Sequence, residues 1–169
     1  KNEIFKLPNE LEQQVYSLNN SSNQIHFILM FGYFKITHRF FDSVTYYNED
    51  IEYIISKFKL VNCLYTSDIA QSTLTLYKRQ IRQYFYCVKF TSNIYEILQK
   101  ESNLLVRKLL KMQDIFYLLV EKSMELKIEI PSYTQIVTII SSSINTQNNL
   151  VYKKIKKYEN HEALKNLDY

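Results

Sequence analysis

Four basic side chains without a neighbouring acid form the first feature of this sequence that could do chemistry. The stretch 74–90 contains no Asp or Glu and carries Lys78, Arg79, Arg82 and Lys89. Drawn as an α-helix, it places its apolar residues on one stripe and its cations largely on the other side. Such a face can bind the phosphates of a polyanion, or it can simply be solvated.

A second basic cluster lies near the C-terminal end of the chain. Its members fall within about half of the circumference of a helix: Lys153, Lys154, Lys156 and Lys157. Val151, Ile155 and Tyr158 fall on the opposite side, where we expect them to pack inward. Each cluster alone equals the formal net charge of the whole chain, +4, so the remaining residues carry a net negative charge. This segregation favours an anionic partner bound locally.

A third basic group follows the apolar run 25–34 and consists of Lys35, His38 and Arg39. Cations at this position can complement the dipole of a helix that ends there. They can also form an edge that contacts phosphates. Both interpretations remain open from the residues alone, and we keep Lys35 and Arg39 as candidate phosphate contacts.

A small polar face without charge occupies the start of the segment 132–145. Ser132 and Gln135 have the spacing of a capping box, which predicts a helix that begins here. The face itself consists of Tyr133, Thr134, Gln135 and Thr138. A preceding helix over 113–127 and a turn that ends at Pro131 would make a helix-turn-helix, in which Gln can bond adenine. A helical hairpin that binds nothing is the alternative.

The composition predicts the elements that position these residues. Forty-six per cent of the 169 residues are hydrophobic, with one Gly and two Pro. Turns and hairpins of sheet proteins need more of these two residues, so we expect an all-α protein. The periodicity predicts helices over 7–18, 22–37, 49–60, 74–90, 94–110, 113–127, 132–145 and 147–167. We expect the residues 1–90 to form a first unit and 91–169 a second.

Other chemistry has little support in the sequence. His26, His38 and His161 are scattered, and Cys63 and Cys87 form no paired motif, so we expect no metal site, no cofactor and reduced thiols. No paired carboxylates or nucleophile motif predicts a catalytic residue. The run 25–34 is about half of the roughly 20 residues that span a bilayer, so it predicts a buried core helix and no membrane partner.

Several motifs together resemble the N-terminal region of Tn-three family transposases, the large replicative transposases of bacteria. The resemblance rests on FILMFGYFK at 27–35 with HRFF at 38–41, on IEYI at 51–54, on the helix 77–85, and on the segment 127–133, in this order. It covers about residues 7–158. The family often has Gly after the aromatic residue at the position of Phe85, where this chain has Tyr86. That departure leaves the end of this helix open.

The resemblance implies two tandem helical DNA-binding units of the centromere-protein-B-like helix-turn-helix type, which bind the terminal inverted repeats of a transposon. The cleavage and strand-transfer chemistry of transposition belongs to a distant RNase-H-like domain of the family. We therefore expect double-stranded DNA as partner, no catalysis, and a location in the bacterial cytoplasm at the nucleoid. The chain would be an excised domain or a truncated remnant of a mobile element.

The expected roles divide between two kinds of residue. The basic residues of 74–90, with Lys35, Arg39, Lys153 and Lys154, would hold phosphates. The polar face that begins at Tyr133 would probe bases. The alternative is a helical protein-interaction module, because the chain has 15 Tyr and Tyr is enriched at interfaces. The sequence predicts neither a monomer nor a self-associated form.

Overall fold

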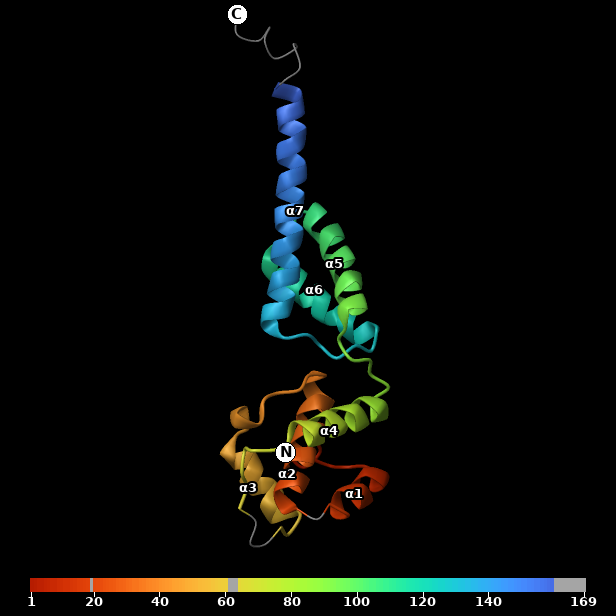
Figure 1. The fold of residues 1–169 in the computed structure, drawn as a ribbon, viewed down its shortest axis with the longest axis vertical. Helices are drawn as coiled ribbons and strands as arrows, with labels where there is room; N and C mark the ends of the chain where they lie inside the picture. The colour runs from red at the N-terminus through yellow and green to blue at the C-terminus, as the bar shows by residue number, and fades with distance from the viewer. Residues whose placement is uncertain (19, 61–63, 160–169) are drawn as a thin grey trace, which may run out of the picture. The chain divides into compact units, whose positions relative to one another are not determined.

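The computed structural model describes residues 1–18, 20–60 and 64–159. It confirms the prediction of an all-α fold, because the described residues form helices and no β-strand (Figure 1). The elements are α1 (Asn9–Tyr16), α2 (Ser21–Thr37), the short 3₁₀ helix η1 (Ser43–Thr45), α3 (Asn48–Lys57), α4 (Gln71–Tyr84), α5 (Ser92–Arg107), α6 (Met112–Glu125) and α7 (Tyr133–Glu159). None of the helices within the described ranges combines the length and the apolar character that a bilayer crossing requires.

The helices divide into two compact units. Unit 1 consists of Lys1–Lys89 together with Lys127–Ile130, and unit 2 consists of Phe90–Leu126 and Pro131–Tyr169. The predicted units are 1–90 and 91–169, and the segment 127–130 of the predicted second unit belongs to unit 1.

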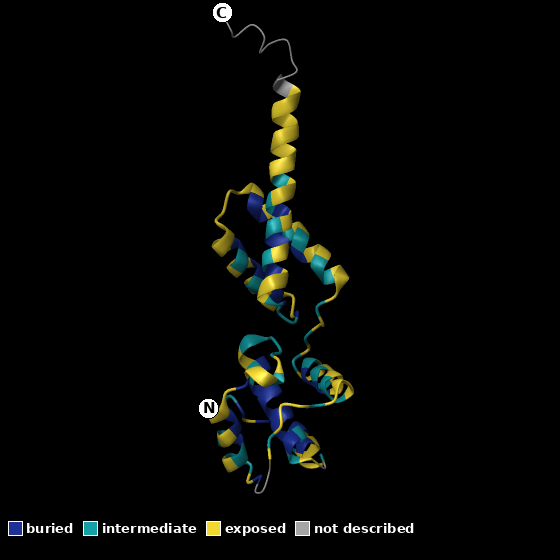
Figure 2. Cartoon of the chain, turned by 60° about the vertical axis from the view of Figure 1, so that its left-hand side comes forward, coloured by how far each residue is buried: buried dark blue, intermediate teal, exposed yellow. Residues whose placement is uncertain are grey.

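Helix α2 is the centre of unit 1, as its apolar run predicts. Its residues from Ile25 to Phe34 are buried with the exception of Tyr33, which is half-buried. Helices α1, α3 and α4 pack against α2, so almost its whole circumference is covered (Figure 2). Gly32 lies against the ring of Phe5, which comes from the segment before α1. A side chain at position 32 would overlap that ring.

Unit 2 is built from α5, α6 and α7. Leu98 and Leu105 of α5 pack with Leu119 of α6 and with Ile136, Ile139 and Ile140 of α7, all of which are buried. A polar contact crosses this core, because Gln99 Nε2 donates to the carbonyl oxygen of Ile139 over 3.1 Å. Helix α5 is continuous through residues 101–103.

Two predicted helix boundaries are corrected. Helix α4 ends at Tyr84 rather than at Phe90, because Tyr86 has a φ of 52° and turns the chain into the left-handed region. Lys89 and Val88 therefore lie beyond the helix. The predicted break between residues 145 and 147 does not exist, because α7 runs through it as one helix of 27 residues. The predicted helical residues 160–167 lie outside the described part of the chain.

The helix starts match the predictions only in part. Ser132 and Gln135 form the predicted capping box, with Ser132 N donating to Gln135 Oε1 over 2.8 Å and Gln135 N donating to Ser132 Oγ over 3.2 Å. Helix α1 begins at Asn9, after the predicted start at residue 7, and has no side-chain cap. Helix α4 begins at Gln71, before the predicted start at residue 74, and also has no side-chain cap.

Candidate nucleic-acid interface

Three cations of the predicted basic face lie on α4, and they have different surroundings. Arg79 is exposed. Lys78 Nζ and the guanidinium carbon of Arg82 each lie 5.6 Å from the centre of the Phe40 ring, so both cations cover one aromatic side chain. Arg82 Nη1 also donates to Glu129 Oε2 over 2.9 Å. Arg82 is therefore held inside unit 1, whereas Arg79 is free to meet a ligand.

The segment 127–130 brings Glu129 to Arg82. Val88 N donates to the Lys127 carbonyl oxygen over 2.8 Å, and Glu129 N donates to the Val88 carbonyl oxygen over 2.8 Å, which makes a single parallel bridge. Ile130 N donates to the carbonyl oxygen of His38 over 2.9 Å. The segment is thus fastened to the residues after α4 and to the end of α2. Lys89, directly after Val88, is exposed.

The basic residues at the end of α2 also differ in the contacts that they make. Lys35 is exposed, and its Nζ donates to the carbonyl oxygen of Glu3 over 2.6 Å. The guanidinium carbon of Arg39 lies 5.3 Å from the centre of the Phe41 ring. His38 caps α2 with a left-handed conformation, so it turns the chain toward Arg39 and Phe40. Unit 1 thereby brings Arg39, Lys78 and Arg82 close to a pair of neighbouring phenylalanines.

The polar face at the start of α7 is exposed as predicted. Thr134, Gln135 and Thr138 are exposed, and Tyr133 is 64% exposed with its ring 5.4 Å from that of Phe116. The hydroxyl of Thr138 donates to the carbonyl oxygen of Thr134. Gln135 uses its amide oxygen in the capping box, which leaves its amide group as a hydrogen-bond donor for a ligand.

The connection between α6 and α7 differs from a short helix-turn-helix turn. It runs from Leu126 to Ser132, and four of its residues belong to unit 1. A typical helix-turn-helix turn has three or four residues. The helix-turn-helix assignment of unit 2 stays a prediction.

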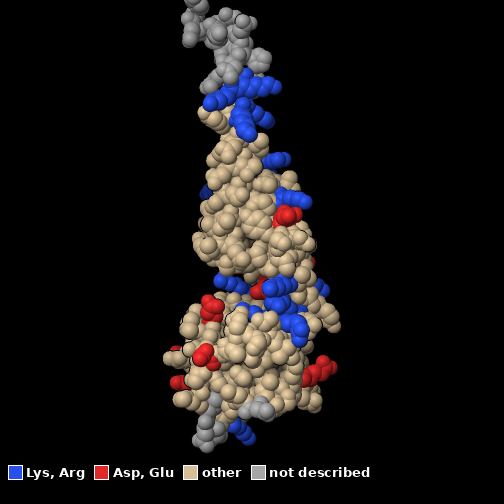
Figure 3. All heavy atoms as spheres, viewed as in Figure 1, with Lys and Arg blue, Asp and Glu red and all other residues tan. Residues whose placement is uncertain are grey.

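The lysine cluster lies on the last described turns of α7. Lys153, Lys154, Lys156 and Lys157 are exposed, and Figure 3 shows Lys and Arg side chains gathered over these turns. Val151 and Ile155 were predicted to pack inward, but they are 45% and 50% exposed because α7 extends past the helices that cover its first half. The side chain of Tyr158 lies outside the described residues.

The described residues do not bring together a metal-binding group. Residues 1–18, 20–60 and 64–159 hold no cluster of His, Cys, Asp or Glu suited to a metal ion. Burial raises the pKa of the Cys87 thiol to about 11, which keeps it protonated and unreactive. His26 is buried in α2, where its Nε2 lies 2.8 Å from the Thr66 carbonyl oxygen and where burial lowers the pKa of its ring. Cys63 lies outside the described residues.

Two residues of this site were missed by the sequence analysis. Phe40 lies beneath two cations, and Glu129 fixes one of them. Glu129 is 47 residues from Arg82, so no local pattern indicates the pair. Phe40 follows the basic pair His38 and Arg39 directly, and this adjacency is a signal that could have found it.

Comparison with known protein families finds a match to most of the chain. The model of a family described as "Domain of unknown function (DUF4158)" matches residues 2–143, which cover unit 1 and the helices of unit 2 up to the middle of α7. No curated protein matches the sequence.

Proposed function

We propose a DNA-binding function for this chain, which belongs to the DUF4158 family, matched over residues 2–143. The observation that carries the proposal is the arrangement of α7, where a small polar face and a lysine cluster lie on one continuous helix. Eighteen residues separate Gln135 from Lys153, which corresponds to about 27 Å at 1.5 Å per residue. One turn of duplex DNA is about 34 Å long, so a single helix would reach over most of a turn.

Base recognition is assigned to the first turns of α7. The residues from Tyr133 to Thr138 are exposed and carry no charge, and the capping box holds the amide group of Gln135 at the start of the helix. Side chains of this kind discriminate base edges, and a Gln amide pairs with adenine. The lysines at the other end, Lys153 and Lys154, would then contact phosphates.

Phosphate binding in unit 1 is assigned to the exposed cations. Arg79, Lys35 and Lys89 are exposed, and Lys78 is half-buried above Phe40. Arg82 has a different role in this proposal, because its ion pair with Glu129 leaves it little freedom to bind a phosphate. We treat it as a positioning residue that holds the segment 127–130 against α4.

The transposase assignment follows from the resemblance in the sequence. The motif FILMFGYFK lies in α2, the central helix of unit 1, and the motif at 77–85 forms the basic face of α4 and its end. We infer that the chain recognises the terminal inverted repeats of a transposon without catalysing strand transfer. The same inference implies that the chain is located at the bacterial nucleoid.

A shift assay tests base recognition. We expect a duplex that carries a transposon end repeat to bind at least tenfold more tightly than a scrambled duplex of the same length and composition. Gln135→Glu keeps an acceptor for the capping box, but it replaces an adenine partner with a cytosine partner. Its preference should therefore change at one base pair, whereas Thr146→Ala, an exposed change on the same helix, should leave every preference intact. Equal affinity for both duplexes would contradict base recognition.

A second candidate function is protein binding through unit 2. An apolar groove of about 370 Å³ lies between α6 and α7 and is lined by Met112, Phe116, Tyr117, Tyr133 and Val137, among others. Several of these side chains are exposed, and aromatic residues and Met are enriched at interfaces. Tyr117→Ala should weaken the binding of a protein partner in the groove and spare DNA binding, whereas Gln135→Glu, outside the groove, should change DNA binding and spare the protein partner.

A further inference from the structure

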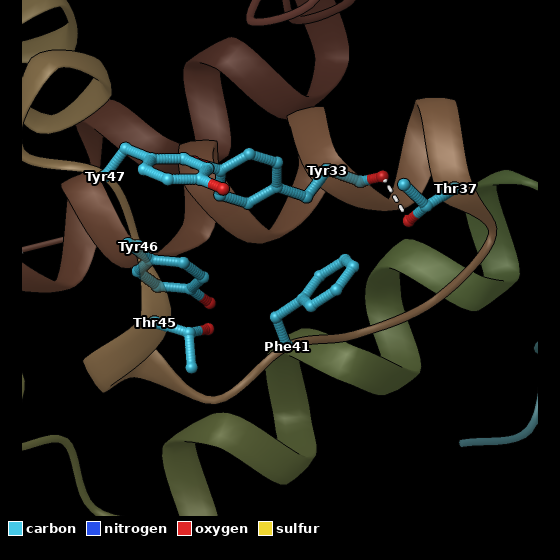
Figure 4. Close-up of a pocket in the computed structure, with 6 residues that line it drawn as sticks. All are labelled: Tyr33, Thr37, Phe41, Thr45, Tyr46 and Tyr47. Atoms are coloured by element: carbon cyan, nitrogen blue, oxygen red, sulfur yellow. Dashed lines mark hydrogen bonds between the residues drawn. The ribbon is translucent and has the colours of Figure 1, made fainter. Parts of the chain in front are cut away.

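Unit 1 encloses an aromatic cavity that neither the basic faces nor the family match explains. Its volume is about 320 Å³, near the lower limit for sites that hold small molecules. Six side chains surround it, and Figure 4 shows them facing a common space: Tyr33, Thr37, Phe41, Thr45, Tyr46 and Tyr47. They come from α2, from the loop that follows it, and from η1 and the residues after it. The cavity therefore lies within a single unit.

The inner walls of this cavity are held in place. The Tyr33 hydroxyl donates to Asp50 Oδ2 over 2.7 Å. The centre of the Tyr33 ring lies 5.5 Å from that of Tyr46 and 5.9 Å from that of Phe41. Tyr46 is buried. Tyr47, in contrast, is 71% exposed and forms an outer wall. Fixed aromatic faces with one exposed partner are suited to stacking on a flat ring, because the side chains lose little conformational freedom when the ring binds.

The polar groups of the cavity indicate a ligand with hydrogen-bonding edges. The hydroxyls of Thr37 and Thr45 donate to the carbonyl oxygens of Tyr33 and Asp42. The Tyr46 hydroxyl is buried and has no hydrogen-bond partner among the described residues. In Figure 4 it is directed toward the space between Tyr46 and Phe41. A buried hydroxyl without a partner is costly, so a ligand carbonyl or ring nitrogen would improve this site.

The charged groups around the cavity include one cation that can reach a ligand phosphate. The Asp50 carboxylate lies behind Tyr33, but it is already paired with Lys1 Nζ at 2.8 Å. Arg39 lies over the ring of Phe41, a lining residue, and is not among the described ion pairs. The Asp42 carboxylate, directly after Phe41, is exposed and is also not among these pairs, so a cation is the competing ligand that the test must distinguish.

We propose that this cavity binds one nucleobase between its aromatic walls, with Arg39 contacting the attached phosphate. The base would come from DNA held by the chain, at an unpaired end or after it leaves the duplex stack. That source rests on the proposed DNA-binding function. Binding of a free nucleotide by the cavity does not depend on it, so the two can fail separately.

A fluorescence titration with the deoxynucleoside 5′-monophosphate of 2-aminopurine tests the site, because stacking on tyrosine quenches this base. We expect saturable quenching by the full chain. Tyr47→Ala removes an exposed wall and should weaken binding at least fivefold. Tyr46→Phe deletes only the unpartnered hydroxyl and should weaken binding about threefold or more. Tyr16→Ala, an exposed tyrosine on α1 in the same unit, should leave binding unchanged.

Three results would overturn the proposal. The first is no quenching at millimolar nucleotide, and the second is equal affinity of Tyr47→Ala and Tyr16→Ala. The third is displacement of the nucleotide by choline at a lower concentration than by unlabelled dAMP, which would identify a cation cage. A fluorescein-labelled duplex is titrated in parallel. Duplex binding without nucleotide binding would refute the cavity alone, whereas nucleotide binding without duplex binding would refute DNA as its source.

Discussion

The pair of Arg82 and Glu129 gives the prediction that most clearly separates a positioning residue from a phosphate contact. The two side chains are 13% and 20% exposed, and the joining atoms are 2.9 Å apart. Exposed ion pairs contribute about 0.2–1 kcal/mol, and removing one partner of a fully buried pair costs about 3–5 kcal/mol. We expect the free energy that this pair contributes to lie between these limits, because some water reaches both groups.

We therefore expect Arg82→Ala to lower the free energy of unfolding by about 2 kcal/mol, including the contact with Phe40, which contributes about 0.5–1 kcal/mol. Glu129→Gln removes the charge but keeps the size of the side chain, and it should cost about 1 kcal/mol. Because each change breaks the same pair, their effects should not add. The coupling free energy of the double variant should be about 1 kcal/mol.

Urea unfolding followed by circular dichroism measures these values, since urea does not screen charges as a guanidinium salt does. Arg79→Ala is the matched control, because it removes an exposed cation one turn earlier on α4 and should change stability by less than about 0.5 kcal/mol. Arg79→Ala should instead weaken DNA binding for all sequences alike. The reasoning is refuted if Arg82→Ala costs no more than Arg79→Ala, or if the double variant shows no coupling.

Three further predictions are tested by urea unfolding. Gly32→Ala should destabilise unit 1 by about 1–3 kcal/mol, because the added methyl group overlaps the buried Phe5 ring. This overlap costs more than the better helix propensity of Ala contributes. An unchanged free energy of unfolding would show that the Phe5 ring can move. Leu109→Gly should stabilise unit 2 by about 1 kcal/mol, because Leu109 follows α5 with a φ of 58°, which Gly adopts without strain. Lys108→Gly is the control and should destabilise unit 2, because Lys108 has an ordinary φ of −80°. A lower free energy of unfolding for Leu109→Gly than for Lys108→Gly would contradict the prediction. Burial lowers the pKa of His26 in the folded chain, so the unfolded chain binds a proton at a higher pH than the folded chain does. The free energy of unfolding should therefore fall as the pH drops below about 6.5. His26→Gln should remove this fall, and a variant with the same pH profile as the original chain would refute the prediction.

The sequence allowed the prediction of features that depend on local pattern. The central position of α2 follows from an apolar run without a polar face, and the capping box at Ser132 follows from two residues with fixed spacing. Both depend on residues that are close in the sequence. The exposure of the polar face that follows Ser132 has the same origin.

The remaining features depend on energies that a local pattern does not contain. The end of α4 at Tyr84 requires Tyr86 to adopt a left-handed conformation without being Gly, and the bonds of Val88 to residues 127 and 129 accompany that turn. The continuity of α7 through Asn145 was missed because polar residues were interpreted as a break. Asn costs a helix only about 0.7 kcal/mol or less relative to Ala, so without Gly or Pro the helix continues.

The aromatic cavity of unit 1 illustrates the same limit. Its lining residues all lie between Tyr33 and Tyr47, a short span of the sequence. Their spacing, however, follows neither a helix nor a strand, because a loop and η1 interrupt it. Only the fold of the chain after α2 brings their side chains to one space.

The salt dependence of duplex binding tests the central claim most directly. Fluorescence anisotropy of a labelled 30-base-pair duplex, measured from about 50 to 300 mM KCl, should give a logarithm of the association constant that falls linearly with the logarithm of salt, by about 0.9 for each phosphate contact. Arg79→Ala and Lys153→Ala should each reduce that slope by about 1. Absence of binding at the lowest salt, or an affinity that does not change with salt, would contradict the account.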